Sequence, residues 1–156
     1  IMSNYHKNPA SLFIITGDHA DRTSLDPNPT FYERYSVPCI IYGTGITKDM
    51  IPGGVAGNHI HIAPTLFELI APQGFEYYSV GKSLTQGNHI GINHEFWITP
   101  DFIGRIGNSS IQRLPWRQGN EPFADTGRIQ QDVEAMRAVS WWQVKHGEYL
   151  TKSVIK

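Results

Sequence analysis

An apolar run that stops abruptly at two polar residues is the feature that most constrains this fold. Leu12–Thr16 is followed directly by Gly17, Asp18 and His19. Such a run is typical of a strand buried on both faces of a parallel sheet. Gly17 lets the backbone turn tightly, so Asp18 and His19 are expected at the strand's C-terminal end, where open α/β sheets bind ligands. The sequence therefore predicts two metal ligands here, with the other ligands supplied from elsewhere.

Composition narrows the class of protein. A chain of 156 residues with 40% hydrophobic residues is long enough for a globular core. Its formal net charge of −1 gives no reason to expect a nucleic acid as partner. The single cysteine, Cys39, excludes an internal disulfide. No apolar run approaches the roughly 20 residues that span a bilayer, and no segment of this sequence has the pattern expected of a signal peptide. Because the chain starts at Ile1 and enters a strand early, we expect a fragment of a longer protein.

The first half has the pattern of an α/β domain. A polar, proline-containing loop with a short turn near Tyr32 separates two predicted buried strands, and a Gly-rich loop leads to a short helix. Pro64 fits the first turn of that helix and Pro72 ends it. The expected elements are strands at Leu12–Thr16 and Val37–Gly43, a loop at Thr44–Gly57 and a helix at Ile62–Ile70.

The second half is less regular. Glu95–Thr99 and Phe102–Ile106 predict an antiparallel hairpin turning at Pro100 and Asp101, and 108–127 is expected to be a loop. A helix is predicted beyond it, with Lys145 and His146 in its last turn and Gly147 as its C-cap. Its expected apolar stripe contains Ile129, Val133, Met136, Val139 and Trp142.

The order of several short motifs resembles the C-terminal half of a sulfatase-like domain of the alkaline phosphatase superfamily. The closest branch is the lipoteichoic acid synthase and phosphoglycerol transferase type. The resemblance covers roughly Leu12 to Leu84. Its motifs are Thr16-Gly17-Asp18-His19, Glu33-Arg34-Tyr35-Ser36-Val37-Pro38, His59-Ile60-His61-Ile62-Ala63-Pro64-Thr65-Leu66 and Gly81-Lys82-Ser83-Leu84.

The resemblance implies both a fold and a chemistry. It implies the C-terminal part of an alkaline-phosphatase-like α/β/α sandwich over 1–86, with the hairpin, linker and C-terminal helix over 87–156 packed on the same domain. Family members use one or two divalent metals and a Thr, Ser or formylglycine nucleophile to attack a phosphate or sulfate ester. By resemblance, Asp18 and His19 are metal ligands. Because sulfatases more often carry Asp-Asn here for Ca²⁺, the His favours Mn²⁺ or Zn²⁺ over Mg²⁺ or Ca²⁺.

The same resemblance implies that part of the site is missing from this chain. The family's nucleophile and first acidic ligand lie N-terminal to the Asp-His pair, so we expect both upstream of Ile1 and no turnover by this chain alone. Cys39 lacks the Pro and Arg that follow a formylglycine-forming Cys, and it is expected to be a small buried core thiol.

Further polar residues have structural and functional interpretations. His59 and His61 alternate, so on an extended segment they point to one side and can share a metal. A structural role for both is favoured, with His59 near the substrate as the alternative. His61 stands where the family usually has an Asp that braces the helix start. Arg22 has the reach to bind a phosphate, although a solvated loop Arg is the simpler interpretation.

Structural roles are expected for the remaining histidines, for Thr16 and for the two adjacent tryptophans. His89 and His94 are expected to be loop residues, and Thr16 to complete its strand. Trp141 and Trp142 cannot both face inward from one helix, so one of them is expected to dock on another element or on the missing half.

Two functions remain in play for the complete protein. The first is a metal-dependent phosphate or sulfate ester hydrolase, or a phosphoglycerol-type transferase, acting on the extracytoplasmic face of the membrane or in the periplasm by resemblance. The second is a non-catalytic, sulfatase-like interaction module. The expected partners are the ester substrate and the missing N-terminal half. Because a half-domain exposes sheet edge and apolar surface, self-association is also expected.

Overall fold

The computed structural model describes residues 10–20, 27–87, 90–107, 111–114 and 126–154. The chain divides into two compact units, 1–53 and 54–156. This boundary differs from the one expected after residue 86. Within the second unit, the side-chain amide of Asn58 donates a hydrogen bond to the carbonyl oxygen of Ile92 and so ties the start of this unit to its sheet.

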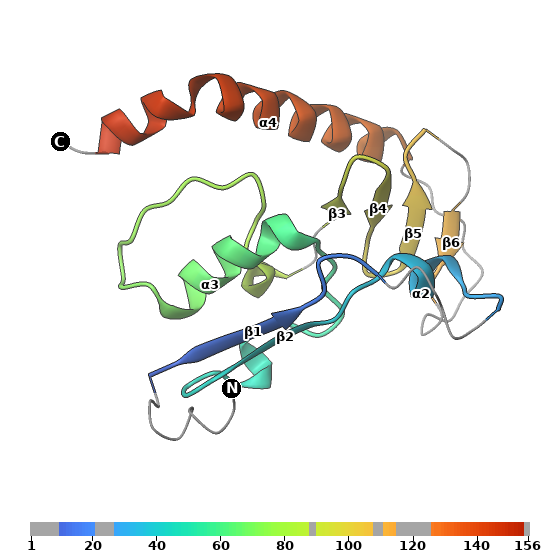
Figure 1. Ribbon diagram of the computed structural model, residues 1–156, viewed down its shortest axis with the longest axis horizontal. Helices are drawn as coiled ribbons and strands as arrows, with labels where there is room; N and C mark the ends of the chain where they lie inside the picture. The colour runs from blue at the N-terminus through green and yellow to red at the C-terminus, as the bar shows by residue number, and fades with distance from the viewer. Residues whose placement is uncertain (1–9, 21–26, 88–89, 108–110, 115–125, 155–156) are drawn as a thin grey trace. The chain divides into compact units, whose positions relative to one another are not determined.

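The first unit is built on a two-stranded ribbon (Figure 1). β1 (Leu12–Thr16) and β2 (Cys39–Gly43) pair with Leu12 opposite Gly43 and Thr16 opposite Cys39. The bounds of β1 are those predicted, and β2 begins two residues later than expected. The two strands are antiparallel, so the expectation of parallel neighbours is not met between them.

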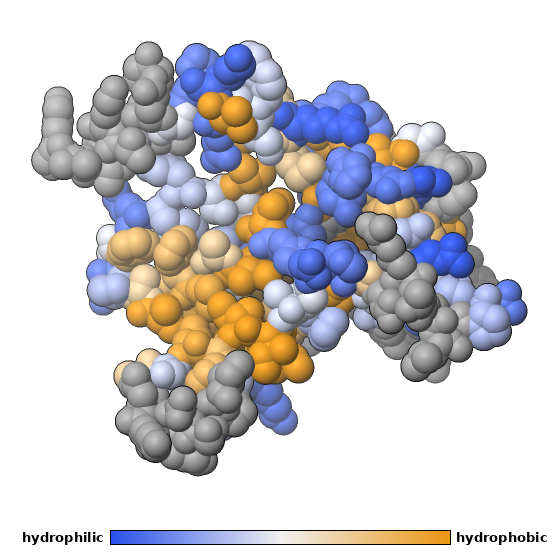
Figure 2. All heavy atoms as spheres, viewed as in Figure 1, coloured by the Kyte–Doolittle hydropathy of each residue, from blue (hydrophilic) through white to orange (hydrophobic). Residues whose placement is uncertain are grey.

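Neither strand of this ribbon is fully buried. The side chains of Ile15 and Ile40, which lie opposite one another, are 53% and 52% exposed. Figure 2 shows apolar side chains gathered over the ribbon. Cys39 is exposed as well, so the expectation of a buried core thiol is wrong. The pattern identified the strands correctly, but two strands alone cannot cover both of their own faces.

Along the chain, the segment between β1 and β2 contains a short helix, α2 (Phe31–Tyr35), where a turn near Tyr32 was predicted. It begins with a capping box: the backbone N–H of Glu33 donates to the Thr30 hydroxyl oxygen at 3.3 Å, and the Thr30 N–H donates to the Glu33 carboxylate at 2.8 Å. The Thr30 hydroxyl also donates to the Glu33 carboxylate at 2.7 Å, and this bond, together with the one from the Thr30 N–H, lowers the pKa of Glu33. A single 3₁₀ turn, η1 (Lys48–Met50), follows β2.

The second unit begins with helical segments and continues into a sheet. The predicted helix is confirmed with its exact bounds as α3 (Ile62–Ile70), preceded by the turn η2 (His59–His61) and followed by η3 (Leu84–Gln86). The sheet is antiparallel in the order β3-β4-β5-β6. Its strands are β3 (Gly91–Ile92), β4 (Phe96–Ile98), β5 (Phe102–Arg105) and β6 (Ile111–Arg113).

The predicted hairpin is confirmed as β4 and β5, with Trp97 opposite Gly104. Thr99 closes its turn, because the hydroxyl oxygen accepts from the Phe102 N–H at 3.0 Å. Gly104 lies directly under the indole ring of Trp97, where an added Cβ would be only 2.4 Å from a ring carbon. A glycine inside a strand thus makes room for the largest side chain of the hairpin.

Two strands of this sheet were not predicted. β3 falls between His89 and His94, which were expected to be loop residues, and β6 falls within the expected loop 108–127. Both are short and are held by pairing with the hairpin, β3 with β4 and β6 with β5. Strands of two or three residues carry too little alternation to be recognised from sequence.

The C-terminal helix α4 (Thr126–Val154) packs its first half on this sheet (Figure 1). Ile129 and Val133 are buried against Ile92 and Trp97 and form the core of the unit. Met136 packs on the edge of that core. Beyond it the stripe fails, because Val139 and Trp142 are exposed. Repeated spacings of three residues drift around a helix of 3.6 residues per turn, so Trp142 lies about 140° away from Ile129.

The predicted end of this helix is also wrong. α4 passes through Gly147 and continues to Val154. Gly147 has no atom within 4 Å of the position that a Cβ would take, so the helix accommodates it without a tertiary contact. Among the described residues, α4 is the longest helix, yet neither it nor any other is both long and apolar enough to span a membrane.

Candidate metal-ligand pair

Asp18 and His19 follow the end of β1 and are separated from it only by Gly17, as the sequence predicted. β1 is held along its whole length by pairing with β2, which fixes the point where the chain leaves the strand. Gly17 fits closely at this exit, since an added Cβ would lie 3.2 Å from the backbone oxygen of His19 and 3.3 Å from the Val37 side chain. The two side chains that follow are exposed, by 91% for Asp18 and 64% for His19.

Local hydrogen bonds orient both groups. The backbone N–H of His19 donates to one carboxylate oxygen of Asp18, Oδ1, at 3.0 Å. The ring nitrogen Nδ1 of His19 lies 2.8 Å from the carbonyl oxygen of Ala20. A carbonyl can only accept, so Nδ1 carries a proton, and in the neutral form of this ring the lone pair is on Nε2. A backbone carbonyl on the second ring nitrogen is the arrangement found in many metal-binding histidines.

The remaining donor atoms lie close together. Nε2 of His19 lies 3.7 Å from Oδ2 of Asp18. A metal bound to both atoms at ordinary bond lengths would hold them about 3.0 to 3.4 Å apart, according to whether its geometry is octahedral or tetrahedral. The observed separation is slightly longer, and small side-chain rotations close the difference. The pair therefore fits one divalent cation that takes mixed nitrogen and oxygen ligands.

The pair supplies two ligands and no more. Among the residues that the structure describes, no group of three or more His, Cys, Asp or Glu side chains is placed to hold a metal. Two side chains would leave most coordination positions to water, which gives weak binding. The chemistry that the pair supports by itself is thus limited to holding a cation loosely at the end of a strand.

His61 has a clear structural position in the second unit. Its side chain is 4% exposed, and its Nδ1 lies 2.8 Å from the carbonyl oxygen of Lys82. No side-chain bond caps α3, so His61 does not replace a capping Asp. Instead it holds the 81–84 segment against the start of the helix. His59, by contrast, is exposed at the start of η2.

Thr65 joins the same two segments by a second route that was not predicted. Its fully buried hydroxyl donates to the carbonyl oxygen of His61 at 2.6 Å and accepts from the backbone N–H of Leu84 at 2.9 Å. Gly81 permits the close approach, because an added Cβ would lie 2.2 Å from the Ile60 carbonyl oxygen. The 59–66 and 81–84 motifs are therefore joined by hydrogen bonds although they are far apart in the sequence.

Arg22 and His89, named as candidates above, lie outside the described residues. His94 is exposed between β3 and β4, where its backbone carbonyl accepts from Arg137 at 3.4 Å. Thr16 completes β1 and its hydroxyl donates to the neighbouring Gly17 carbonyl at 3.3 Å, so it makes no contact that assigns it to a site.

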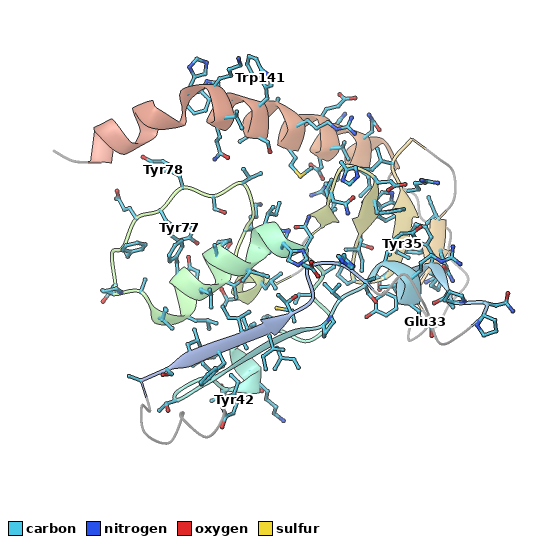
Figure 3. All side chains as sticks on the ribbon, viewed as in Figure 1. Glu33, Tyr35, Tyr42, Tyr77, Tyr78 and Trp141 are labelled. Atoms are coloured by element: carbon cyan, nitrogen blue, oxygen red, sulfur yellow. The ribbon has the colours of Figure 1, made fainter. Side chains whose placement is uncertain are left out.

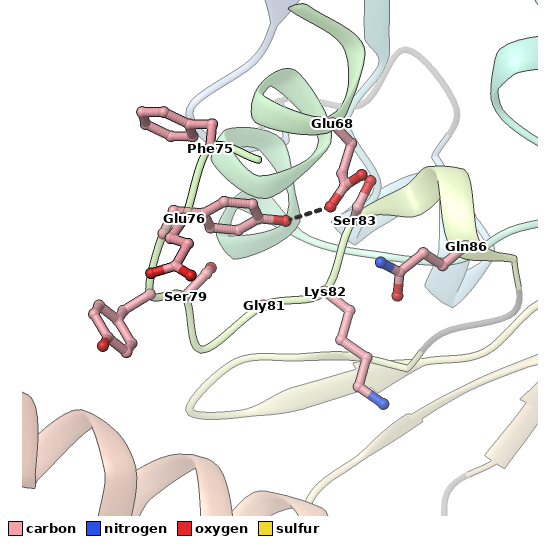
Figure 4. Close-up of a pocket in the computed structure, with 10 residues that line it drawn as sticks. Glu68, Phe75, Glu76, Ser79, Gly81, Lys82, Ser83 and Gln86 are labelled. Atoms are coloured by element: carbon pink, nitrogen blue, oxygen red, sulfur yellow. Dashed lines mark hydrogen bonds between the residues drawn. The ribbon is translucent and has the colours of Figure 1, made fainter. Parts of the chain in front are cut away.

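The second unit also has an open pocket of about 520 Å³ beside α3 (Figure 4). Tyr77 donates its hydroxyl proton to the Glu68 carboxylate at 3.0 Å. Partial burial, together with this bond and the Glu68 charge, raises the pKa of Tyr77. The Tyr77 ring in turn packs 5.0 Å from the ring of Phe67. The pocket is lined by Glu68, Phe75, Glu76, Tyr77, Tyr78, Ser79, Gly81, Lys82, Ser83 and Gln86.

Comparison with protein-family models, curated proteins and solved structures finds no match to this chain. A functional assignment therefore depends on the residues themselves and on the motif order described above.

Proposed function

We propose that this chain contributes the Asp18–His19 metal-ligand pair to a metal-dependent enzyme of the sulfatase type. That enzyme would hydrolyse phosphate or sulfate esters or transfer a phosphoglycerol group. The observation that carries the proposal is the pair's geometry. His19 Nε2 and Asp18 Oδ2, each able to bind a metal, lie 3.7 Å apart just after the end of a strand. The other ligands and the nucleophile would come from other parts of the protein.

The chain's own residues have defined tasks in this proposal. Asp18 and His19 would bind Mn²⁺ or Zn²⁺ in preference to Mg²⁺ or Ca²⁺, because one of the two donors is an imidazole. The metal would supply Lewis-acid polarisation of the ester oxygens. Ala20 holds His19 in the tautomer that leaves Nε2 available, through the 2.8 Å contact with its carbonyl oxygen. Arg22, three residues after His19, is the proposed contact to the ester.

The contacts between two motifs support the finer fold assignment that we propose, the C-terminal part of an alkaline-phosphatase-like sandwich. The 59–66 and 81–84 segments, which the resemblance names separately, are bonded to each other through His61 and Thr65. Such contacts explain why the two sequences would occur together. They do not depend on the metal, so this part of the proposal stands apart from the catalytic one.

The test is a substitution in the complete protein. Asp18→Ala and His19→Ala are each expected to reduce hydrolysis of a nitrophenyl phosphate, phosphodiester or sulfate by at least 100-fold. Asp49→Ala, at an exposed Asp of the same unit, serves as the matched control. Unchanged activity in both site variants would refute the catalytic assignment. Activity on none of the three esters in the unmodified protein would favour a non-catalytic, sulfatase-like interaction module.

A further inference from the structure

The second half of α4 presents aromatic side chains to solvent. Trp141 and Trp142 are 62% and 44% exposed, and Val144 is 86% exposed. Figure 3 shows Trp141 on the side of α4 that faces away from α3 and the sheet of the same unit. The helix thus has a buried face in its first half, and in its second half the adjacent residues Trp141 and Trp142 expose their indoles. We call these two side chains the aromatic face of α4.

Charge distinguishes the two halves of the helix as well. Residues 137–156 contain four Lys or Arg residues and one Glu, a formal charge of +3, in a chain whose overall formal charge is −1. Lys145 lies beside this aromatic face, with its ammonium 5.8 Å from the centre of the Trp141 ring. The ring of His146 lies 5.4 Å from that of Trp142. Exposed indoles therefore occur within a basic stretch of the sequence.

These features fit a particular class of partner. Trp side chains favour the boundary between water and lipid, where the ring is buried and the N–H stays hydrated. Lys residues on a surface helix add attraction to anionic headgroups, and their long stems let the charge reach water. A second copy of this chain would bring like charges together, which is unfavourable.

We propose that the aromatic face of α4 docks on the surface of a membrane containing anionic phospholipid. The helix would lie along the headgroup region, with Trp141 and Trp142 inserted and Lys145 near the phosphates. This inference does not rest on the Asp18–His19 pair, because α4 belongs to the second unit and the pair belongs to the first.

The test is co-sedimentation of the full chain with vesicles of two compositions. We expect binding to phosphatidylcholine vesicles containing 30 mol% phosphatidylglycerol, and binding weaker by at least tenfold to pure phosphatidylcholine. Trp141→Ala/Trp142→Ala should weaken binding to the anionic vesicles by roughly tenfold or more. Tyr78→Ala, which removes an aromatic side chain that is 65% exposed elsewhere in the same unit, is the matched control and should bind normally.

Separate variants test the electrostatic contribution to vesicle binding. Lys145→Gln should weaken binding about fivefold, whereas Lys82→Gln, at an exposed Lys outside α4, should not. Raising the salt to about 1 M should also weaken binding, because the Debye length falls to about 3 Å. Absence of binding to the anionic vesicles would overturn the proposal. So would equal loss with Tyr78→Ala, or binding of soluble polyglutamate as tight as that of the vesicles, which would indicate an acidic protein partner.

Discussion

Single residues explain much of how the segments of the second unit are held together. Thr65 and Gly81 are the clearest cases. The buried hydroxyl of Thr65 makes two hydrogen bonds, and Gly81 has no side chain to prevent the close approach of the two segments. Neither requirement is visible in the sequence, where both residues are simply parts of short motifs. A buried Thr inside a helix and a Gly before Lys-Ser become interpretable only when the two segments are seen in contact.

Gly81→Ala is expected to destabilise the second unit. The added Cβ would lie 2.2 Å from the carbonyl oxygen of Ile60, so the backbone of one segment must move. The expected loss is about 1 to 3 kcal/mol in the free energy of unfolding, measured by urea denaturation. Gly147→Ala is the control, since its Cβ meets no atom within 4 Å and a helix favours Ala by up to about 1 kcal/mol. Equal stability of the two variants would contradict the packing argument.

The capping box of α2 makes the titration of Glu33 sensitive to Thr30. Bonds from the Thr30 hydroxyl and N–H lower the pKa of Glu33, so they stabilise the folded state at pH values above the unfolded pKa. That contribution is lost as the pH falls through the lowered folded pKa. Thr30→Ala should move the pKa of Glu33 back toward its ordinary value in an NMR titration, whereas Thr47→Ala should not. An unchanged Glu33 titration in Thr30→Ala would refute the bond.

At the scale of elements, local signals were sufficient in some places and failed in others. β1 and α3 match their predicted bounds because each has local signals. β1 is an apolar run that ends before Gly17, and α3 has a proline in its first turn and another after its end. β3 and β6 were missed because pairing with the hairpin, rather than their own pattern, makes them strands. The candidate ligands Asp18 and His19 could be placed from sequence because they follow a predicted strand directly. The contact between His61 and Lys82 could not, since it joins residues far apart in the chain.

The two halves of α4 should respond differently to the same substitution. Val133 is fully buried in the core, so Val133→Ala is expected to cost about 2 to 3 kcal/mol of unfolding free energy. Val144 is 86% exposed, and Val144→Ala should change stability by less than about 0.5 kcal/mol. Denaturation of both variants in urea makes the comparison. A large loss for Val144→Ala would show that the second half of the helix is packed within this chain.

At the scale of the whole molecule, the exposed β1–β2 ribbon and the small net charge favour self-association. Ile15 and Ile40 are cross-strand partners, and each is about half exposed. A net charge of −1 gives little electrostatic repulsion between copies of the chain. Sedimentation velocity should show a mass that rises with concentration. Ile40→Lys should reduce this rise, and Val144→Lys, on the exposed part of α4, should reduce it less. A monomer at every concentration would contradict the expectation.

Paramagnetic NMR of this chain tests whether Asp18 and His19 bind a metal together. Mn²⁺ added in small amounts to this chain should broaden the resonances of Asp18 and His19 before those of any other residue, because their donor atoms already lie close together. Binding should be weak, since two ligands leave most positions to water. Asp18→Ala should abolish the selective broadening while leaving the stability of the chain within about 0.5 kcal/mol. Broadening centred on His59 or His94 instead, with Asp18 and His19 unaffected, would contradict the account.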